Sequence, residues 1–311
     1  MKPKVAFYWC AACGGCEEAV LDLAHELLEV VAAVDIVFWP VALDFKEGDV
    51  SALEDGAIDI AFLNGAIRTT HEAEMARLFR RKAKVVVAFG TCSHLGGIGG
   101  LSNLNSRDEI LTEVYGDSPP VLRFQDDGAV LTLPALLGSI YPLDRYVAVD
   151  YYVPGCPPSV PVVKNALQIL LGGPLPERGS VLAPERALCD ECPRRDSKPA
   201  DLAIQEFRRV QEVLIDTSKC ILAQGVPCLG SATRGGCGAR CIQANMPCTG
   251  CFGPTSRVRD AGAKALSALA SLLAGRDSEE IDHAIDGIPD PVGWFYRYSF
   301  AASFLGRTHP E

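Results

Sequence analysis

Thirteen cysteines in 311 residues are the feature that most constrains what this chain can fold into. Eight of them fall between residues 174 and 255, where proline, glycine and arginine replace the aliphatic periodicity of a packed core. A segment of that composition buries too little apolar surface to fold by itself, so we expect bound metal to order it. The other cysteines follow short, unbroken apolar runs, which are typical of buried parallel strands.

The expected compartment decides between disulfides and metal. The N-terminal apolar run, Val5 to Trp9, is too short for the core of a signal peptide, and no twin-arginine pair precedes it, so we expect a cytoplasmic chain. Cytoplasmic thiols stay reduced, and an odd number of cysteines argues against a disulfide framework and for metal. No apolar run approaches the roughly 18 residues of a membrane span. The net charge of −10 argues against a nucleic-acid-binding surface.

Residues 1–173 are expected to form the first domain, because buried strands and amphipathic helices alternate there. The predicted strands are 4–9, 35–39, 58–63, 85–89 and 145–153. The predicted helices are 17–34, 69–81 and 160–171. Thr69 and Glu72 form a capping box at the start of the second helix. The order predicts a flavodoxin-like, doubly wound α/β sheet, in which ligands gather at the carboxyl ends of the strands. Cys16 (with Cys13), Cys92 and Cys156 stand at three such ends.

Residues 174–311 are expected to form a second, irregular cysteine-rich domain with C-terminal helices. Its pattern predicts a helix near 203–213 and helices at 261–274 and 278–285. Three four-cysteine sites in the whole chain use twelve thiols and leave Cys10 spare. By spacing, the two sites of the second domain are Cys189, Cys192, Cys220 and Cys228, and Cys237, Cys241, Cys248 and Cys251.

Zinc is the alternative to iron–sulfur clusters for each four-cysteine site. Structural zinc sites join two short C-x2–4-C pairs. The site at residues 237–251 fits that spacing, whereas Cys92 and Cys156 in the first domain are single and far apart in sequence. Cys156 also precedes Pro157, a cysteine–proline pair that recurs beside iron–sulfur clusters. The complete set favours clusters, and a zinc-stabilised scaffold without a redox role is the competing hypothesis.

Longer strings of residues resemble a known family. The loop Cys13-x-x-Cys16-x-Glu18, the turn Gly90-Thr91-Cys92 and the segment Pro154-Gly155-Cys156-Pro157 are similar, in this order, to motifs of the small subunit of [NiFe] hydrogenases. The strings at residues 7–10, 38–41 and 233–253 resemble the cytoplasmic, methyl-viologen-reducing type that is associated with heterodisulfide reductase. The resemblance covers nearly the whole chain.

The resemblance implies an electron-relay subunit without a catalytic residue of its own. Electrons from H2 oxidation at the nickel–iron site of a separate large subunit would pass through this chain to a [2Fe-2S] subunit and a flavin-containing heterodisulfide reductase, as in methanogenesis. The implied cofactors are three [4Fe-4S] clusters: a proximal one on Cys13, Cys16, Cys92 and Cys156, a medial one on Cys237, Cys241, Cys248 and Cys251, and a distal one on Cys189, Cys192, Cys220 and Cys228. Many relatives have histidine at the position of Cys189, and many have proline where a fourth medial ligand would stand. In this chain the fourth thiol of the implied medial set is Cys241, which stands four residues after Cys237 and not at that proline position.

A third hypothesis is the related cluster subunit of a quinone- or membrane-linked respiratory complex. The two glycines between Cys13 and Cys16 and the eight extra cysteines count against it, because such relatives typically carry only the first-domain site. Three further residues have two interpretations each. Glu18 is a proton carrier or a helix-start carboxylate, His94 is a donor to a cluster sulfur or a loop histidine, and Cys10 is a reactive thiol or a packed one.

Overall fold

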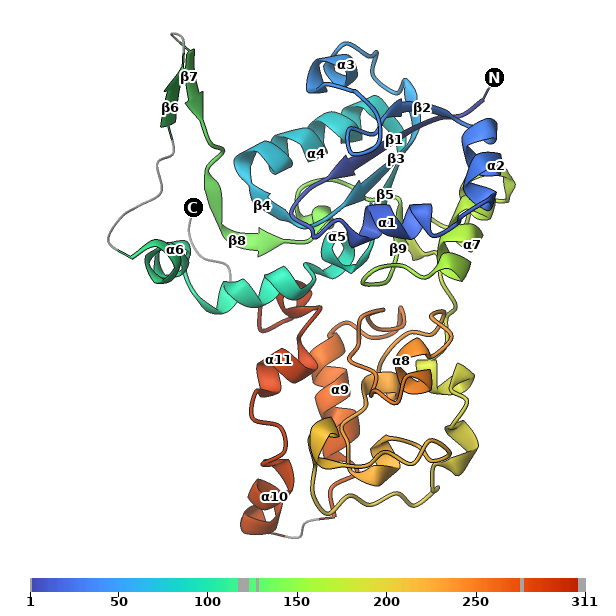
Figure 1. The fold of residues 1–311 in the computed structure, drawn as a ribbon, viewed down its shortest axis with the longest axis vertical. Coiled ribbons are helices and arrows are strands. Elements are labelled where there is room, and N and C mark those ends of the chain that lie inside the picture. The colour runs from blue at the N-terminus through green and yellow to red at the C-terminus, as the bar shows by residue number, and fades with distance from the viewer. Residues whose placement is uncertain (1, 117–122, 127–128, 275–276, 307–311) are drawn as a thin grey trace.

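Six parallel strands build the upper part of the molecule (Figure 1). The computed structural model describes residues 2–116, 123–126, 129–274 and 277–306. The strands lie in the order β10-β9-β5-β3-β1-β2, which in chain order is the flavodoxin-like arrangement 2-1-3-4-5 with a sixth strand at its edge. The predicted fold class is therefore confirmed. The bounds are β1 (Lys4–Trp9), β2 (Asp35–Phe38), β3 (Ile58–Asn64), β5 (Ala83–Phe89), β9 (Tyr151–Val153) and β10 (Ser180–Val181).

Helices cover both faces of this sheet (Figure 1). One face packs against α1 (Gly15–Leu21), α2 (Glu26–Ala33) and α7 (Val160–Gly172), and the other packs against α3 (Glu47–Ser51) and α4 (Thr70–Lys82). The predicted capping box is present, since the Thr69 hydroxyl accepts from the Glu72 N–H and the Glu72 carboxylate accepts from the Thr69 N–H. Side chains alternate between the two cores along each strand, as period-two geometry requires.

The single helix predicted over 17–34 is wrong. The structure has two helices, and Ala24, with a φ of 52°, lies in the turn between them. Val20 and Leu27 nevertheless pack on the same core, so the apolar periodicity runs through the turn without a visible break. The strand predicted over 145–153 is also too long, because only Tyr151–Val153 pairs in the sheet.

The connections between these elements carry shorter pieces that the pattern did not predict. Two small antiparallel sheets, β4–β8 and β6–β7, stand beside the main sheet. The pieces are β4 (Ile67–Thr69), β6 (Arg123–Asp126), β7 (Ala129–Thr132), β8 (Leu136–Tyr141), α5 (Thr91–Leu95), α6 (Arg107–Tyr115), and the 3-10 helices η1 (Ile98–Leu104) and η2 (Leu143–Arg145).

The lower part of the molecule consists mainly of loops and single turns (Figure 1). Its turns are η3 (Leu188–Glu191), η4 (Arg195–Ser197), η5 (Val210–Glu212), η6 (Leu222–Gln224), η7 (Leu229–Ser231) and η8 (Phe300–Ala302). Its helices are α8 (Arg240–Gln243), α9 (Ala261–Ala270), α10 (Ser278–Ile285) and α11 (Pro291–Phe295). The prediction of α10 is confirmed, and α9 ends four residues earlier than predicted.

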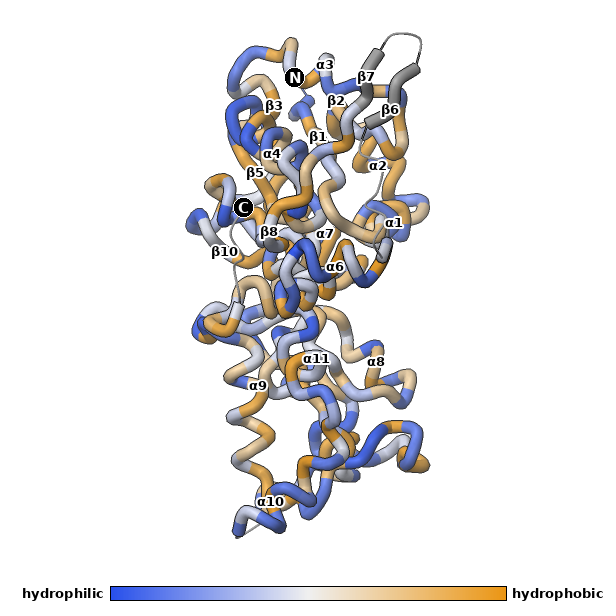
Figure 2. Tube along the Cα trace, turned by 90° about the vertical axis from the view of Figure 1, so that its left-hand side faces the viewer, coloured by the Kyte–Doolittle hydropathy of each residue, from blue (hydrophilic) through white to orange (hydrophobic). Residues whose placement is uncertain are grey.

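The helix predicted near 203–213 is wrong as well. Ile204 forms a bridge with Leu273, and the Phe207 N–H donates to the carbonyl of Ala284 at 2.7 Å. The backbone around Ile204 and Phe207 is thus paired with distant segments, and the only helical turn in this stretch is η5. Figure 2 shows the contrast between the parts: hydrophobic residues follow the upper strands, whereas hydrophilic and hydrophobic residues alternate closely along the lower loops.

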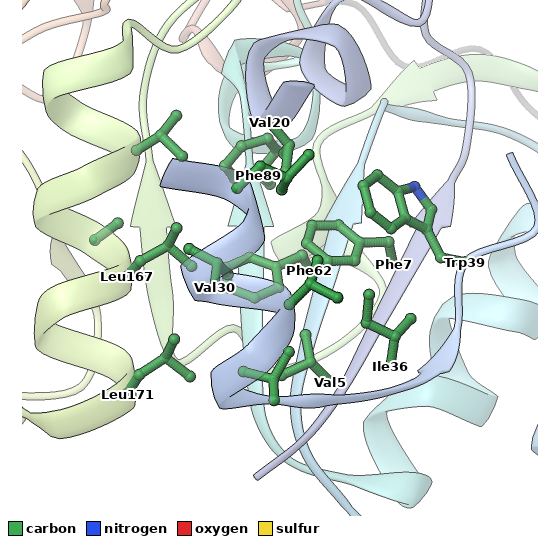
Figure 3. Close-up of a pocket in the computed structure, with 15 residues that line it drawn as sticks. Val5, Phe7, Val20, Val30, Ile36, Trp39, Phe62, Phe89, Leu167 and Leu171 are labelled. Carbon is green, nitrogen blue, oxygen red and sulfur yellow. The ribbon is translucent and has the colours of Figure 1, made fainter. Parts of the chain in front are cut away.

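An apolar pocket of about 30 Å³ lies between the sheet and helices α2 and α7 (Figure 3). Phe7, Phe62, Val30 and Leu167 point into it, and all of its lining residues are aliphatic or aromatic. Ligand sites need a few converging polar groups to orient what they bind, and the residues that line this pocket offer none. The cysteine loops are therefore the candidate functional site. Within the described residues, no helix has the length and apolarity needed to span a bilayer.

Candidate metal centres

The first group of cysteines gathers at the carboxyl edge of the large sheet. Cys13 and Cys16 lie where β1 passes into α1, Cys92 lies at the start of α5 after β5, and Cys156 follows β9. Burial raises the pKa of Cys16, and the thiols of Cys92, Cys156 and Cys13 raise it further. The structure thus brings the four predicted residues together from three strand ends, as the parallel sheet leads one to expect.

Glycine backbone lines two of these sulfurs. A Cβ on Gly90 would lie 2.3 Å from the Sγ of Cys16, and a Cβ on Gly97 would lie 2.4 Å from the Sγ of Cys92. Both glycines have positive φ angles, +87° and +62°. Only glycine fits such positions, so the space beside both sulfurs is kept free of side chains.

The chemistry of this group fits a metal-containing cofactor. Burial raises the pKa of Cys92 to about 12, and Cys156 and Cys13 contribute to the shift. Burial and the neighbouring Cys13 also raise the pKa of Cys156. The shifts at Cys16, Cys92 and Cys156 disfavour the thiolate form of these three side chains. A bound metal centre reverses that preference, because its positive charge favours the deprotonated ligand.

The second group lies in the lower part of the molecule, around η3 and η7. Burial raises the pKa of Cys189 to about 12, and the thiols of Cys228, Cys192 and Cys220 add to the shift while Lys198 opposes it. The four residues predicted for this group are therefore close neighbours.

The third group lies between the other two. Burial raises the pKa of Cys251 to about 12, and Cys237 and Cys241 raise it further. Cys248 is buried, and this burial is the main cause of its raised pKa. The neighbouring thiols of Cys228 and Cys251 raise the pKa further. The Cys248 N–H donates to the Sγ of Cys228 at 3.3 Å, so this residue stands next to members of two groups.

Thr91 joins the first group to the third. Its hydroxyl donates to the carbonyl of Cys251 at 2.6 Å and accepts from the Gly155 N–H at 3.0 Å. A hydrogen bond from the Cys156 N–H also lowers the pKa of Cys251, against the larger effect of burial. Sequence reasoning singled out Cys92 but not its neighbour Thr91. The position of Thr91 inside the Gly90-Thr91-Cys92 turn was the available signal.

Glu17 is a second residue that sequence reasoning missed. It is 4 % exposed, its carboxylate accepts from Asn64 Nδ2 at 2.6 Å and from the indole N–H of Trp39, and burial raises its pKa. Glu18, by contrast, is exposed in the first turn of α1. The sequence contains no signal for the enclosure of Glu17, because Glu17 and Glu18 are identical neighbours and the partners Trp39 and Asn64 lie on other strands or loops.

The two other residues with open interpretations are both enclosed. The ring of His94 contacts that of Tyr152, tilted by 38° with centroids 4.5 Å apart, and burial, together with the charge of Arg234, lowers the pKa of His94 to about 4. Cys10 is 5 % exposed, and burial raises its pKa well above the ordinary value. Cys10 is thus a packed strand-end thiol, and a thiol of that kind is a poor nucleophile.

The spacing of the ligands bears on the zinc hypothesis. A tetrahedral zinc site with Zn–S bonds of about 2.3 Å brings its sulfurs to roughly 4 Å from one another. Among the residues that the structure describes, no three Cys, His, Asp or Glu side chains converge in a way that would hold a single metal ion. A cluster keeps its thiolates farther apart, because several iron and sulfide atoms lie among them. The two kinds of site therefore differ in the separation of their sulfurs.

Comparison with known proteins gives matches over the whole chain. The family model described as NADH ubiquinone oxidoreductase, 20 Kd subunit, matches residues 13–170. The iron-sulfur subunit of the F420-non-reducing hydrogenase of Archaeoglobus profundus is 35 % identical over 99 % of both chains. A vhu subunit of the F420-non-reducing hydrogenase of Methanocaldococcus jannaschii is 36 % identical over 98 % of this chain and 97 % of its own.

A solved structure shares the fold. A chain of the [NiFeSe]-hydrogenase of Dm. baculatum is 19 % identical, covers 82 % of this chain and 96 % of its own, and has a TM-score of 0.52. Eight of the thirteen cysteines lie beyond residue 170, outside the family model but inside the whole-length matches.

Proposed function

The chain belongs to the family of iron–sulfur small subunits of F420-non-reducing hydrogenases, and from this premise we propose that it carries electrons between the nickel–iron site of a large subunit and an external acceptor. It is a non-catalytic, electron-transferring subunit of an oxidoreductase complex. Bound iron–sulfur clusters supply reversible one-electron transfer, which no side chain of this protein offers. The protein's own contribution is to hold thiolates, shield them from water and hydrogen-bond them.

The proposed ligands are the three groups of cysteines, each binding one [4Fe-4S] cluster. Cys13, Cys16, Cys92 and Cys156 would hold the proximal cluster, supported by their convergence at one sheet edge. The distal ligands would be Cys189, Cys192, Cys220 and Cys228, and the medial ligands would be Cys237, Cys241, Cys248 and Cys251. We place Cys248 in the medial set because it shares the short loop of Cys251, although it also contacts Cys228.

The proposed domains are residues 1–173 and residues 174–311. The sheet and its two cores support the first unit, and separate hydrophobic clusters around Leu222 and Leu188 support the second. Strand β10 (Ser180–Val181) returns briefly to the first sheet after α7 ends at Gly172. The first unit would carry the proximal cluster, and the second would carry the other two.

A large hydrogenase subunit is the partner that family membership supports directly. Its docking face would include the surroundings of the Cys13 loop, where Trp9 and Val41 are 39 % and 50 % exposed. We further propose that electrons leave through a [2Fe-2S] subunit to a flavin-containing heterodisulfide reductase in the cytoplasm. The resemblance of residues 7–10, 38–41 and 233–253 to the methyl-viologen-reducing type supports this acceptor.

The observation that carries the proposal is the meeting of Cys13, Cys16, Cys92 and Cys156 from three separate strand ends. The experiment is a metal analysis of the complex purified without oxygen, in which we expect about twelve iron atoms per chain. Cys156→Ser should abolish hydrogen-dependent dye reduction and leave the nickel content of the large subunit unchanged. Cys10→Ser, a change of the same kind outside the groups, should retain dye reduction. Stoichiometric zinc without a reducible chromophore would overturn the proposal.

A further inference from the structure

Glu191 connects two of the cysteine groups. It stands between Cys189 and Cys192, and its side chain is 12 % exposed. One carboxylate oxygen, Oε1, accepts from the N–H of Gly236 at 2.8 Å and from the N–H of Gly238 at 2.9 Å. These two amides lie on either side of Cys237, a residue of the third group. Both amides are 45 positions or more from Glu191 in the sequence.

The other carboxylate oxygen faces a cation. Oε2 of Glu191 accepts from Nη2 of Arg186 at 3.1 Å, and the side chain of Arg186 is 55 % exposed. An exposed arginine offsets only part of the carboxylate's field, because water screens it. The negative charge of Glu191 therefore still acts on the loop that it binds.

The carboxylate of Glu191 lies next to the backbone on both sides of Cys237, because Oε1 accepts from the amides that precede and follow this residue. A fixed charge at this place acts on any centre that Cys237 binds. In addition, Glu191 occupies the two amides on either side of Cys237, which are thereby withheld from any sulfur. Hydrogen bonds to sulfur and nearby positive charge both raise the potential of an iron–sulfur centre.

From these contacts we infer that Glu191 is a positioning residue, which fixes the Cys237 loop against the Cys189–Cys192 loop and keeps the centre at Cys237 low in potential. This inference rests on the proposed function, since it requires a cluster at Cys237. A fixed negative charge opposes the arrival of an electron, so removing it makes reduction easier. The carboxylate thus serves two purposes with one set of contacts: it sets the separation of two centres, and it tunes one of them.

The test is a redox titration of the anaerobically purified complex, followed by electron paramagnetic resonance. Glu191→Gln keeps the size and an acceptor oxygen but removes the charge. We expect the reduction equilibrium of the centre at Cys237 to shift about tenfold towards the reduced form, which is about 59 mV for one electron. The signal of that centre is assigned by its change in Cys237→Ser.

Asp190→Asn is the matched control. It removes the same charge from the neighbouring position, where Asp190 accepts from the Ala187 N–H at 3.1 Å and faces Arg195 at 3.4 Å, both of which lie outside the Cys237 loop. Its effect on the centre at Cys237 should be several-fold smaller than that of Glu191→Gln. Arg186→Gln should move the same centre in the opposite direction, because it leaves the carboxylate in place and removes its cation.

The outcomes separate the inference from the proposed function. If the wild-type chain binds no cluster at Cys237, the proposed function fails, and iron analysis shows this before any variant is made. If the wild type is loaded and Glu191→Gln shifts this centre no more than Asp190→Asn does, the inference is overturned. Selective loss of this centre in Glu191→Gln, with Asp190→Asn fully loaded, would support the positioning role. If Glu191→Gln binds no cluster at all, the potential of the centre at Cys237 is compared between Arg186→Gln and the wild type. An unchanged potential in Arg186→Gln counts against the inference.

Discussion

Gly90→Ala is the substitution that tests the sulfur environment of the first group most directly. The new Cβ would lie 2.3 Å from the Sγ of Cys16, well inside the distance at which either atom can stay in place. Overpacking of this kind typically costs about 1–3 kcal/mol. With a ψ of 163°, the φ of +87° lies in a region that is essentially confined to glycine, which adds about 1–3 kcal/mol for any residue with a Cβ. We therefore expect Gly90→Ala to destabilise the protein by about 2–6 kcal/mol and to displace the sulfur of Cys16.

Gly179→Ala separates the two contributions. Gly179 has nearly the same φ, +89°, but a Cβ there would meet no atom within 4 Å. The control should lose only a conformational share, about 1–3 kcal/mol. A larger loss in Gly90→Ala than in Gly179→Ala then reports the steric effect on Cys16.

Denaturant unfolding of both variants, combined with iron analysis, is the assay. We expect Gly90→Ala to lack the iron of the first centre, about four atoms of twelve, and Gly179→Ala to retain all of it. If the two variants unfold at the same denaturant concentration and carry the same iron, the sulfur of Cys16 is not confined by Gly90. The glycine backbone would then have no part in shaping the first centre.

Three further changes have expected results of their own. Thr91→Val should cost about 1–3 kcal/mol in urea unfolding, because it leaves the buried carbonyl of Cys251 and the N–H of Gly155 without a partner, while Thr91→Ser keeps both bonds and should cost far less. Iron removal by a chelator should open residues 174–255 to limited proteolysis and leave the sheet of the first part resistant, since metal is expected to order only that segment. Burial holds the pKa of His94 at about 4 in the folded chain, below its ordinary 6.5. Above about pH 6.5 the ring is neutral in both states and costs no stability, and the free energy of unfolding decreases as the pH falls from there towards 4. Thermal unfolding between pH 7 and pH 4.5 should show a smaller decline for His94→Gln than for the wild type.

The large sheet could be predicted because parallel strands buried on both faces are unbroken apolar runs. β1 matches its predicted bounds, and the capping box at Thr69 places the start of α4. The turn at Ala24 could not be predicted, because the residues on its two sides pack on one core and keep one periodicity. The segment near Phe207 could not be predicted either, since its backbone partners lie in distant segments.

The candidate site also has a part that could be predicted from the sequence and a part that could not. The four cysteines at strand ends follow from topology, because a parallel sheet brings carboxyl ends to one edge. Thr91 and Glu191 depend on hydrogen bonds that cross 160 and 45 positions of the chain. Spacing rules describe ligands on neighbouring turns and contain no information about such distant partners. Polar contacts around a metal centre are therefore found from structure, even where the ligands themselves are evident from sequence.

The short segment from Cys248 to Cys251 supports the order of centres that we propose. At one end, the carbonyl of Cys251 accepts from Thr91, next to Cys92 of the first group. At the other end, the N–H of Cys248 donates to the Sγ of Cys228 of the second group. Four residues thus contact both outer groups, so the third group lies between them and the separation of all three is set by one loop. A shift of this loop would lengthen one gap as it shortens the other. The hydroxyl of Thr91 restrains that movement directly, and the carboxylate of Glu191 holds another part of the third group, the loop around Cys237, against the second group.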